Sequence, residues 1–338
     1  MLNTALADPA DERVTLEEPI GGGSQATVFR ARRADGSVVA AKRVSAADDT
    51  AVAGLHAEAL ALQRCVHPHV LPYHGLAAID DAVLLLTPLA ETDLADRLAH
   101  GGPLPWPEVA AIGMAMASAL AAVHAHALVH RDVKPANILW LDGVPRLADF
   151  GSATSHGVGS TQRDTDTIVG SAPYLDPRVV DGTPADPAAD VYALGATLHE
   201  AVTGQAPFLA ATVPATLDAA RVGAWARPDI AGAHALLDVI EAAVGPFDQR
   251  PTAAAMAAQL AQATPTSRAG SDTPAEPAAW VRPQPLRPAR AGLSATRDFG
   301  VRAHLPAGGL VDRHRATLAL VGMAGVAVTT LAAVASLA

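Results

Sequence analysis

Only two of the 24 basic side chains in this 338-residue chain are lysines, Lys42 and Lys134. The ammonium group of lysine is a compact point charge, whereas the planar guanidinium of arginine suits bidentate partners. In a chain that otherwise uses arginine, these two positions are the first to inspect for chemistry that needs an ammonium, such as the neutralisation of phosphate oxygens.

A glycine-rich run, Ile20-Gly-Gly-Gly-Ser-Gln-Ala-Thr-Val28, comes shortly before Lys42. Glycines let the backbone approach a polyphosphate and direct N–H groups toward it. A lysine on a neighbouring strand can reach the α- and β-phosphates, and Glu58 on the following helix can hold that lysine in place. A glycine hairpin without a ligand explains the run equally well. The chain contains no GxxxxGK[ST] motif, and the run opens no helix followed by the acid of a dinucleotide fold.

The strongest motif is His130-Arg-Asp-Val-Lys-Pro-Ala-Asn-Ile-Leu139, followed by Asp149-Phe-Gly151. With these strings at this spacing, the chain resembles the protein kinases, in particular bacterial serine/threonine kinases of the eukaryotic type. The resemblance covers residues 14–262. It continues through further strings: Gly170-Ser-Ala-Pro-Tyr174, Asp190-Val-Tyr-Ala-Leu-Gly195, Thr203-Gly204, Pro207-Phe208 and Asp248-Gln-Arg-Pro-Thr252.

The resemblance implies four catalytic residues. Asp132 is expected to accept or orient the proton of the substrate hydroxyl. Lys134 is expected to neutralise the transferred γ-phosphate, and a lysine at this place is typical of the Ser/Thr-specific class. Lys42 is expected to pair with Glu58 and to bind the α- and β-phosphates of ATP.

The resemblance also implies a metal site and a nucleotide site. Asn137 and Asp149 are expected to hold Mg²⁺, which prefers hard oxygen ligands, and Mn²⁺ is a possible substitute. Leu86 is expected to be the gatekeeper, with backbone groups of Thr87 and Leu89 as hinge contacts. The remaining nucleotide-binding residues cover the phosphates or sandwich the adenine: Ile20, Gly21, Gly22, Gly23, Val28, Ala40 and Leu139. His130, Phe150 and Leu62 are expected to form a stacked apolar spine.

Thr165 and Thr167 match the paired autophosphorylation sites of related bacterial kinases. Arg131 supplies a cation with which such a phosphate can pair. Ser171 replaces the usual threonine of the following motif and is expected to contact the substrate side. Phosphorylation in trans within a homodimer is a possible route.

Two positions depart from the family pattern. Ala26 replaces the third glycine of the glycine-rich run, which is a mild change. Arg178 replaces the glutamate that normally pairs with the arginine corresponding to Arg250. Two cations are expected to face each other there, at a cost in free energy unless an acid such as Asp176 intervenes.

The pattern of elements predicts an α+β fold with a β-rich first lobe and a helical second lobe. Strand-like runs at 27–34 and 37–43 are separated by a turn signal. Helical patterns follow over 51–65, 107–126, 187–203, 233–244 and 252–262. The single Cys65 allows no intrachain disulfide. A net charge of −10 argues against binding to nucleic acid through a basic surface.

Four regions are expected along the chain: a tail at 1–13, a kinase domain at 14–262, a flexible Pro/Ala/Arg-rich linker at 263–315 and a transmembrane helix at 316–338. The last 23 residues carry no charge, and Arg313, His314 and Arg315 precede them. A basic flank on that side predicts a single-pass protein of the cell membrane with its kinase domain in the cytoplasm.

The sequence thus predicts an ATP-dependent serine/threonine protein kinase that acts on proteins. A kinase-like ATP-binding scaffold with weak or no catalysis is the alternative, and Arg178 is its only support. A small-molecule phosphotransferase is a weaker alternative, because it does not need the strings at 170–174 and 190–195.

Overall fold

Five antiparallel strands form the first lobe in the order β1-β2-β3-β5-β4. The computed structural model describes residues 13–22, 26–155, 171–223 and 225–263. The expected linker beyond Ala263 and the expected span 316–338 lie outside the described residues, as do Gly23, Thr165 and Thr167. The strands are β1 (Val14–Gly22), β2 (Thr27–Arg33), β3 (Val38–Ser45), β4 (Gly75–Ile79) and β5 (Ala82–Pro88).

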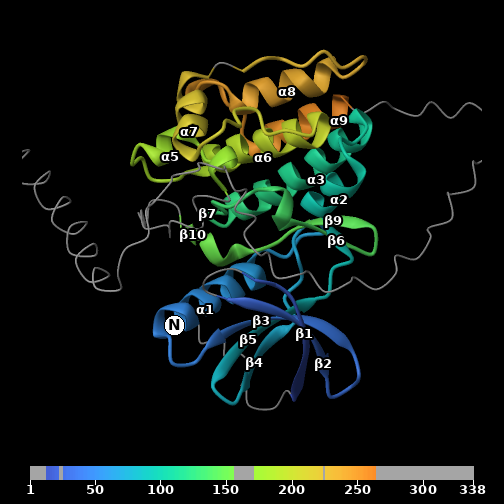
Figure 1. The fold of residues 1–338 in the computed structure, drawn as a ribbon, viewed down its shortest axis with the longest axis vertical. Helices are drawn as coiled ribbons and strands as arrows, with labels where there is room; N and C mark the ends of the chain where they lie inside the picture. The colour runs from blue at the N-terminus through green and yellow to red at the C-terminus, as the bar shows by residue number, and fades with distance from the viewer. Residues whose placement is uncertain (1–12, 23–25, 156–170, 224, 264–338) are drawn as a thin grey trace, which may run out of the picture. The chain divides into compact units, whose positions relative to one another are not determined.

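Helix α1 (Asp49–Arg64) belongs to the same lobe and packs beside the sheet (Figure 1). Asp48 caps it by accepting a hydrogen bond from the Ala51 N–H, which satisfies one of the free donors of the first turn. Leu55, Glu58 and Leu62 are buried on one face at helical spacing. Glu58 is the polar member of that face, so α1 carries it toward the strands.

The second lobe is mainly helical, and α6 (Pro187–Thr203) is its most buried helix. Figure 1 shows α3, α6, α8 and α9 gathered in this lobe. Its other helices are α2 (Leu94–Gly101), α3 (Trp106–Ala125), α5 (Pro177–Val180), α7 (Val213–Val222), α8 (His234–Val244) and α9 (Ala253–Ala263). Its short strands are β6 (Thr92–Asp93), β7 (Leu128–Val129), β8 (Ile138–Leu141), β9 (Val144–Leu147) and β10 (Thr154–Ser155).

Two glycines let the central helices approach closely. A Cβ added to Gly113 in α3 would lie 2.7 Å from Leu198 Cδ1 of α6, and one added to Gly195 would lie 2.7 Å from the Cβ of Ala243 in α8. Real Cβ atoms do not approach so closely. At Gly195 the neighbouring atom is a Cβ, which cannot turn aside, whereas at Gly113 it is the end of the flexible Leu198 side chain, so the packing of α6 depends most clearly on Gly195.

Within the described residues, α3 is the one helix long and apolar enough to cross a membrane by length and composition. Its residues Val109, Met116, Leu120 and Val123 are fully buried in the core of the second lobe. A long core helix meets the same criteria, so α3 itself gives only weak evidence for a membrane.

The expected two-lobed α+β fold is confirmed for the described residues. All five predicted helices occur, with ends within two residues of the expected positions. The predicted hairpin also occurs between β2 and β3, where Gly36 has a φ of 84°.

Candidate active site

Lys42 contacts two carboxylates, one from its own lobe and one from the second lobe. It lies on β3, and its Nζ is 2.8 Å from Glu58 Oε2 of α1 and 2.8 Å from Asp149 Oδ1. Burial disfavours the charged ammonium, but the nearby charges of Asp149 and Glu58 outweigh it, so the pKa of Lys42 is raised. The predicted pairing of Lys42 with Glu58 is present in the structure.

The two carboxylates respond differently to this environment. Burial raises the pKa of Glu58 despite the neighbouring Lys42. Burial also acts to raise the pKa of Asp149, but the charge and hydrogen bond of Lys42 reverse the effect and lower it. Asp149 therefore keeps its negative charge at neutral pH and remains an oxygen ligand for a cation.

The backbone around Asp149 fixes the direction of its side chain. Asp149 has φ 61° and ψ 72°, in the left-handed region, and it precedes a 3-10 turn over Phe150–Ser152. A Cβ added to Gly151 would lie 3.2 Å from both Asp149 Oδ1 and Lys42 Nζ. A side chain here would press on the cluster of Lys42, Glu58 and Asp149, and the glycine leaves that room free.

Asp132 is the centre of a second cluster. Lys134 Nζ lies 2.8 Å from Asp132 Oδ2, and the Ser171 hydroxyl donates to Asp132 Oδ1 at 2.9 Å. Lys134 also donates to Ser171 Oγ at 3.2 Å. The three side chains close a triangle that fixes the carboxylate of Asp132, a residue only 8% exposed.

Asn137, one of the two expected metal ligands, is hydrogen-bonded to this cluster. Its Nδ2 donates to both the backbone oxygen of Asp132 at 2.7 Å and its Oδ2 at 2.9 Å. With the amide nitrogen turned toward Asp132, the amide oxygen is the atom of Asn137 suited to a cation. The oxygen donors of Asn137 and Asp149 thus fit Mg²⁺ as the expected metal.

A buried residue of α6 holds the backbone of the loop His130–Asn137, which carries Asp132 and Lys134 and is here called the catalytic loop. Asp190, whose side chain is fully buried, accepts the N–H of His130 at 2.8 Å and that of Arg131 at 2.7 Å. His124 Nε2 lies 2.9 Å from the same carboxylate. Arg131 has a φ of 72°, a strained conformation that these bonds stabilise. Sequence reasoning found the string that begins at Asp190 but assigned it no role.

His130 and Phe150 pack as expected. Their rings meet edge to face at 4.7 Å, and His130 Nε2 lies 3.1 Å from the backbone oxygen of Ala148. Phe150 shares one buried cluster with Leu62 and Leu76. Leu76 on β4 was not predicted as a member of this apolar cluster, because a single apolar residue in a strand gives no distinct signal in the sequence.

The expected nucleotide-binding residues come from both lobes. Where β1 pairs with β2, Gly21 lies opposite Val28. Where β2 pairs with β3, Val28 lies opposite Lys42. Ala40 is 8% exposed on β3. The others occupy β1, β8 or the chain just after β5: Ile20, Gly22, Leu139 and Leu89.

The expected gatekeeper is wrong by one residue. Across the ladder between β3 and β5, Ala40 lies opposite Thr87, and Ala41 lies opposite Leu86. Residues opposite each other share a face of the sheet, so Thr87 lies on the face of Lys42. Leu86 lies on the other face, fully buried in a cluster with Ala41.

The reason for this error is the apolar run Leu84-Leu-Leu86. Both faces of β5 are covered, so the strand shows no alternation from which its register could be predicted. The alignment of motifs alone left a shift of one residue open, and such a shift turns every side chain to the opposite face.

The expected repulsion between Arg178 and Arg250 is absent, because Asp176 lies between them. Asp176 Oδ2 is 2.7 Å from Arg178 Nη2 and 2.6 Å from Arg250 Nη1. The acid proposed as a compensator therefore takes that role, and the departure at Arg178 is not a sign of a degraded site.

Comparisons with known proteins agree with the site. A family model described as the protein kinase domain matches residues 14–273. The serine/threonine-protein kinase PkaA of Streptomyces coelicolor is 35% identical over 221 residues, covering 59% of this chain and 40% of that protein. PkaB of the same organism is 35% identical over 215 residues, covering 60% and 51%.

PknK of Mycobacterium tuberculosis, also named a serine/threonine-protein kinase, is 40% identical over 145 residues, covering 42% of this chain and 13% of that protein. The alignments thus span about half or less of the length of these relatives. The family model, in contrast, matches most of the chain. The chain therefore belongs to the protein kinase family.

Proposed function

We propose that this chain is an ATP-dependent serine/threonine protein kinase. The observation that carries the proposal is the closed triangle of Asp132, Lys134 and Ser171. It places a fixed carboxylate beside an ammonium, as the transfer of a phosphoryl group to a hydroxyl requires. The names of the similar bacterial proteins support the same reaction.

In the proposed reaction, the substrate hydroxyl oxygen forms a bond to the γ-phosphorus as the bond from that phosphorus to the β,γ-bridging oxygen breaks. Asp132 orients the hydroxyl and accepts its proton, and ADP is the leaving group. Lys134 stabilises the charge on the transferred phosphoryl oxygens. Lys42, held by Glu58, binds the α- and β-phosphates.

Mg²⁺ supplies charge neutralisation at the phosphates, and Asn137 and Asp149 are the residues that would hold it.

The corrected register of β5 also moves the proposed hinge by one residue. The backbone oxygen of Pro88 and the N–H of Ala90 replace those of Thr87 and Leu89 as contacts to the adenine edge. Thr87 replaces Leu86 as the side chain at the back of the site.

Three further parts of the proposal rest on sequence. Thr165 and Thr167 are the proposed autophosphorylation sites, with phosphorylation in trans between two copies as the route. The apolar segment 316–338 is the proposed anchor of a single-pass membrane protein whose kinase domain faces the cytoplasm. Deleting 316–338 should move the protein from the membrane pellet to the soluble fraction, and retention in the pellet would contradict the anchor.

A catalytically silent scaffold has no specific observation in its favour. Its only support was Arg178, and Asp176 neutralises that residue. The test is incubation of the full chain with Mg²⁺ and ATP labelled at the γ-phosphate, beside Asp132→Asn and Lys42→Met. Label on the wild type and on a generic protein, lost in both variants, is the expected result. Binding of ATP without transfer by the wild type would favour the scaffold.

A further inference from the structure

The stretch of chain from the Asp149-Phe-Gly151 motif to α5 is here called the activation segment. At its end lie four charged side chains, Asp176, Arg178, Asp186 and Arg250, here called the anchor cluster. Asp176 lies at its centre with a fully buried side chain, and Arg250 is only 5% exposed. Besides its contacts to both guanidinium groups, Asp176 caps α5 by accepting the N–H of Arg178 at 3.1 Å. Its carboxylate oxygens are thus well supplied with donors.

Asp186 completes the balance of charge. Arg178 Nη2 lies 3.3 Å from Asp186 Oδ1, so two carboxylates offset two guanidinium groups. Arg178 also stacks on Phe247, with its Cζ 3.7 Å from the ring centroid. A neutral and largely buried network of this kind is stable while it is complete, but the loss of one member leaves a buried charge without compensation.

The anchor cluster is connected to the catalytic loop through α6. Asp186 is the N-cap of that helix and accepts the N–H of Ala189 at 3.1 Å. One turn further along, Asp190 holds the N–H groups of His130 and Arg131. Arg178 therefore ties the end of the activation segment to the helix that shapes the catalytic loop.

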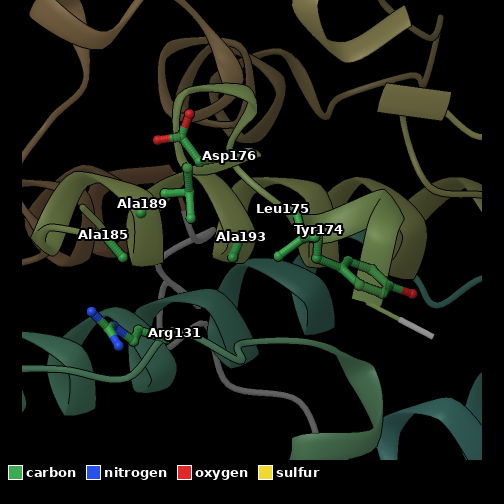
Figure 2. Close-up of a pocket in the computed structure, with 8 residues that line it drawn as sticks. Arg131, Tyr174, Leu175, Asp176, Ala185, Ala189 and Ala193 are labelled. Carbon is green, nitrogen blue, oxygen red and sulfur yellow. The ribbon is translucent and has the colours of Figure 1, made fainter. Parts of the chain in front are cut away.

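Figure 2 shows the positions of Asp176 and Arg131. Asp176 and Arg131 line the same small hollow between the activation segment and α6. The Asp176 carboxylate points away from Arg131, toward the side on which Arg178 and Arg250 bind it. Asp176 therefore serves the anchor cluster, although it lies at the hollow that Arg131 also borders.

We propose that Arg178 is a positioning residue that, together with Asp176 and Arg250, replaces the glutamate–arginine pair of the family pattern and couples the end of the activation segment to the catalytic loop. The catalytic part of this inference rests on the proposed kinase function. It has an unusual consequence: restoring the glutamate of the family pattern should harm this protein. Arg178→Glu would place a third carboxylate beside Asp176 and Asp186 and leave Arg250 as the remaining cation of the anchor cluster.

The activity test compares the full-length wild type with Arg178→Glu, Asp176→Ala and the double variant. Each single change should lower kcat for a protein substrate by about 10- to 100-fold, because small misplacements of a site have effects of that size. The KM for ATP should stay unchanged, since Lys42 and its partners are not touched. The double variant should recover about tenfold over Arg178→Glu, because the new carboxylate can take the place of Asp176 beside Arg250.

Arg227→Glu is the matched control. Arg227 also lies between two carboxylates, 2.7 Å from Asp238 Oδ1 and 2.9 Å from Glu241 Oε2. Both of these acids are more than half exposed, so water screens the reversed charge. This variant should keep the kcat and the melting temperature of the wild type.

A second measurement is independent of phosphate transfer. Arg178→Glu should lower the melting temperature by about 6–12 °C, as expected for an uncompensated buried charge in a domain of this size, and the double variant should melt higher than Arg178→Glu. If the wild type transfers no phosphate, the proposed function fails and the melting temperatures alone decide the role of the cluster. The inference is overturned if Arg178→Glu melts like the wild type, or if the double variant is no better than Arg178→Glu.

Discussion

Thr87 lies directly opposite Ala40 across the ladder between β3 and β5. The pair shares the face of the sheet that carries Lys42, whose Nζ lies between Glu58 and Asp149. Leu86, one residue earlier, is directed into the cluster on the other face. Two adjacent residues of one strand therefore lie on different faces, Thr87 at the proposed nucleotide site and Leu86 in the hydrophobic core.

This division predicts opposite effects of two substitutions. Thr87→Phe should raise the KM for ATP by about tenfold, because a ring on the cleft face reduces the room for adenine. Leu86→Ala should leave that KM unchanged but lower the free energy of unfolding by about 2–5 kcal/mol, since it removes a fully buried side chain. Steady-state kinetics and urea unfolding measure the two effects. A raised KM in Leu86→Ala with unchanged stability would contradict the register.

The sequence predicted the positions of the site residues well where these residues belong to a recognisable motif. Asp132, Lys134 and Asn137 belong to one contiguous string, and the structure brings them together as expected. Lys42 and Glu58 were paired correctly because a strand lysine and a helix glutamate follow the glycine-rich run in a regular order.

Two features needed the three-dimensional structure. The register of β5 depends on the pairing of strands, which a run of leucines does not encode. Whether Arg178 faces another cation depended on the position of Asp176, and the structure places this carboxylate between Arg178 and Arg250, which is distant in sequence. Helix α7 was also missed, because Pro214 lies inside its pattern, although a proline in the first turn is compatible with a helix.

Asp190→Asn should damage catalysis more than nucleotide binding. The asparagine side chain offers one oxygen in place of two, so one of the N–H groups of His130 and Arg131 would face an amide donor. A buried donor without a partner costs about 1–3 kcal/mol, and the strained Arg131 would relax. We expect kcat to fall by at least about tenfold with little change in the KM for ATP.

Asp218→Asn is a suitable control for Asp190→Asn. Asp218 has a side chain that is 70% exposed and pairs with Arg221 on the surface of α7. Its neutralisation should leave kcat unchanged. Equal kcat values for wild type and Asp190→Asn would show that the two backbone hydrogen bonds do not position the catalytic loop.

Gly195→Ala should destabilise the second lobe. The added methyl group would lie 2.7 Å from the Cβ of Ala243, and neither helix can move without disturbing the core. Overpacking of this kind costs about 1–3 kcal/mol. In Gly54→Ala the added methyl has no neighbour within 4 Å, so the same change in α1 should stabilise the protein by about 0.4–1 kcal/mol. Thermal unfolding of both variants measures the difference in sign.

His199 should make stability depend on pH in the weakly acidic range. It is buried against Trp225, with ring centroids 5.8 Å apart, and its Nδ1 lies 2.9 Å from the backbone oxygen of Gln205. Burial lowers its pKa below the ordinary value, against the smaller opposing effect of that hydrogen bond. The folded protein therefore holds the imidazole neutral at a pH at which the unfolded chain protonates it.

The direction of the effect follows from the count of protons. Between the folded pKa and about 6.5 the unfolded state binds more protons, so stability rises with pH there. The contribution of His199 is complete above about pH 6.5 and is lost as the pH falls through the folded pKa. We expect the melting temperature of the wild type to drop more than that of His199→Gln between about pH 7.5 and pH 5.5. His100→Gln, at an exposed position of α2, should retain the dependence of the wild type; parallel curves for wild type and His199→Gln would exclude His199 as its source.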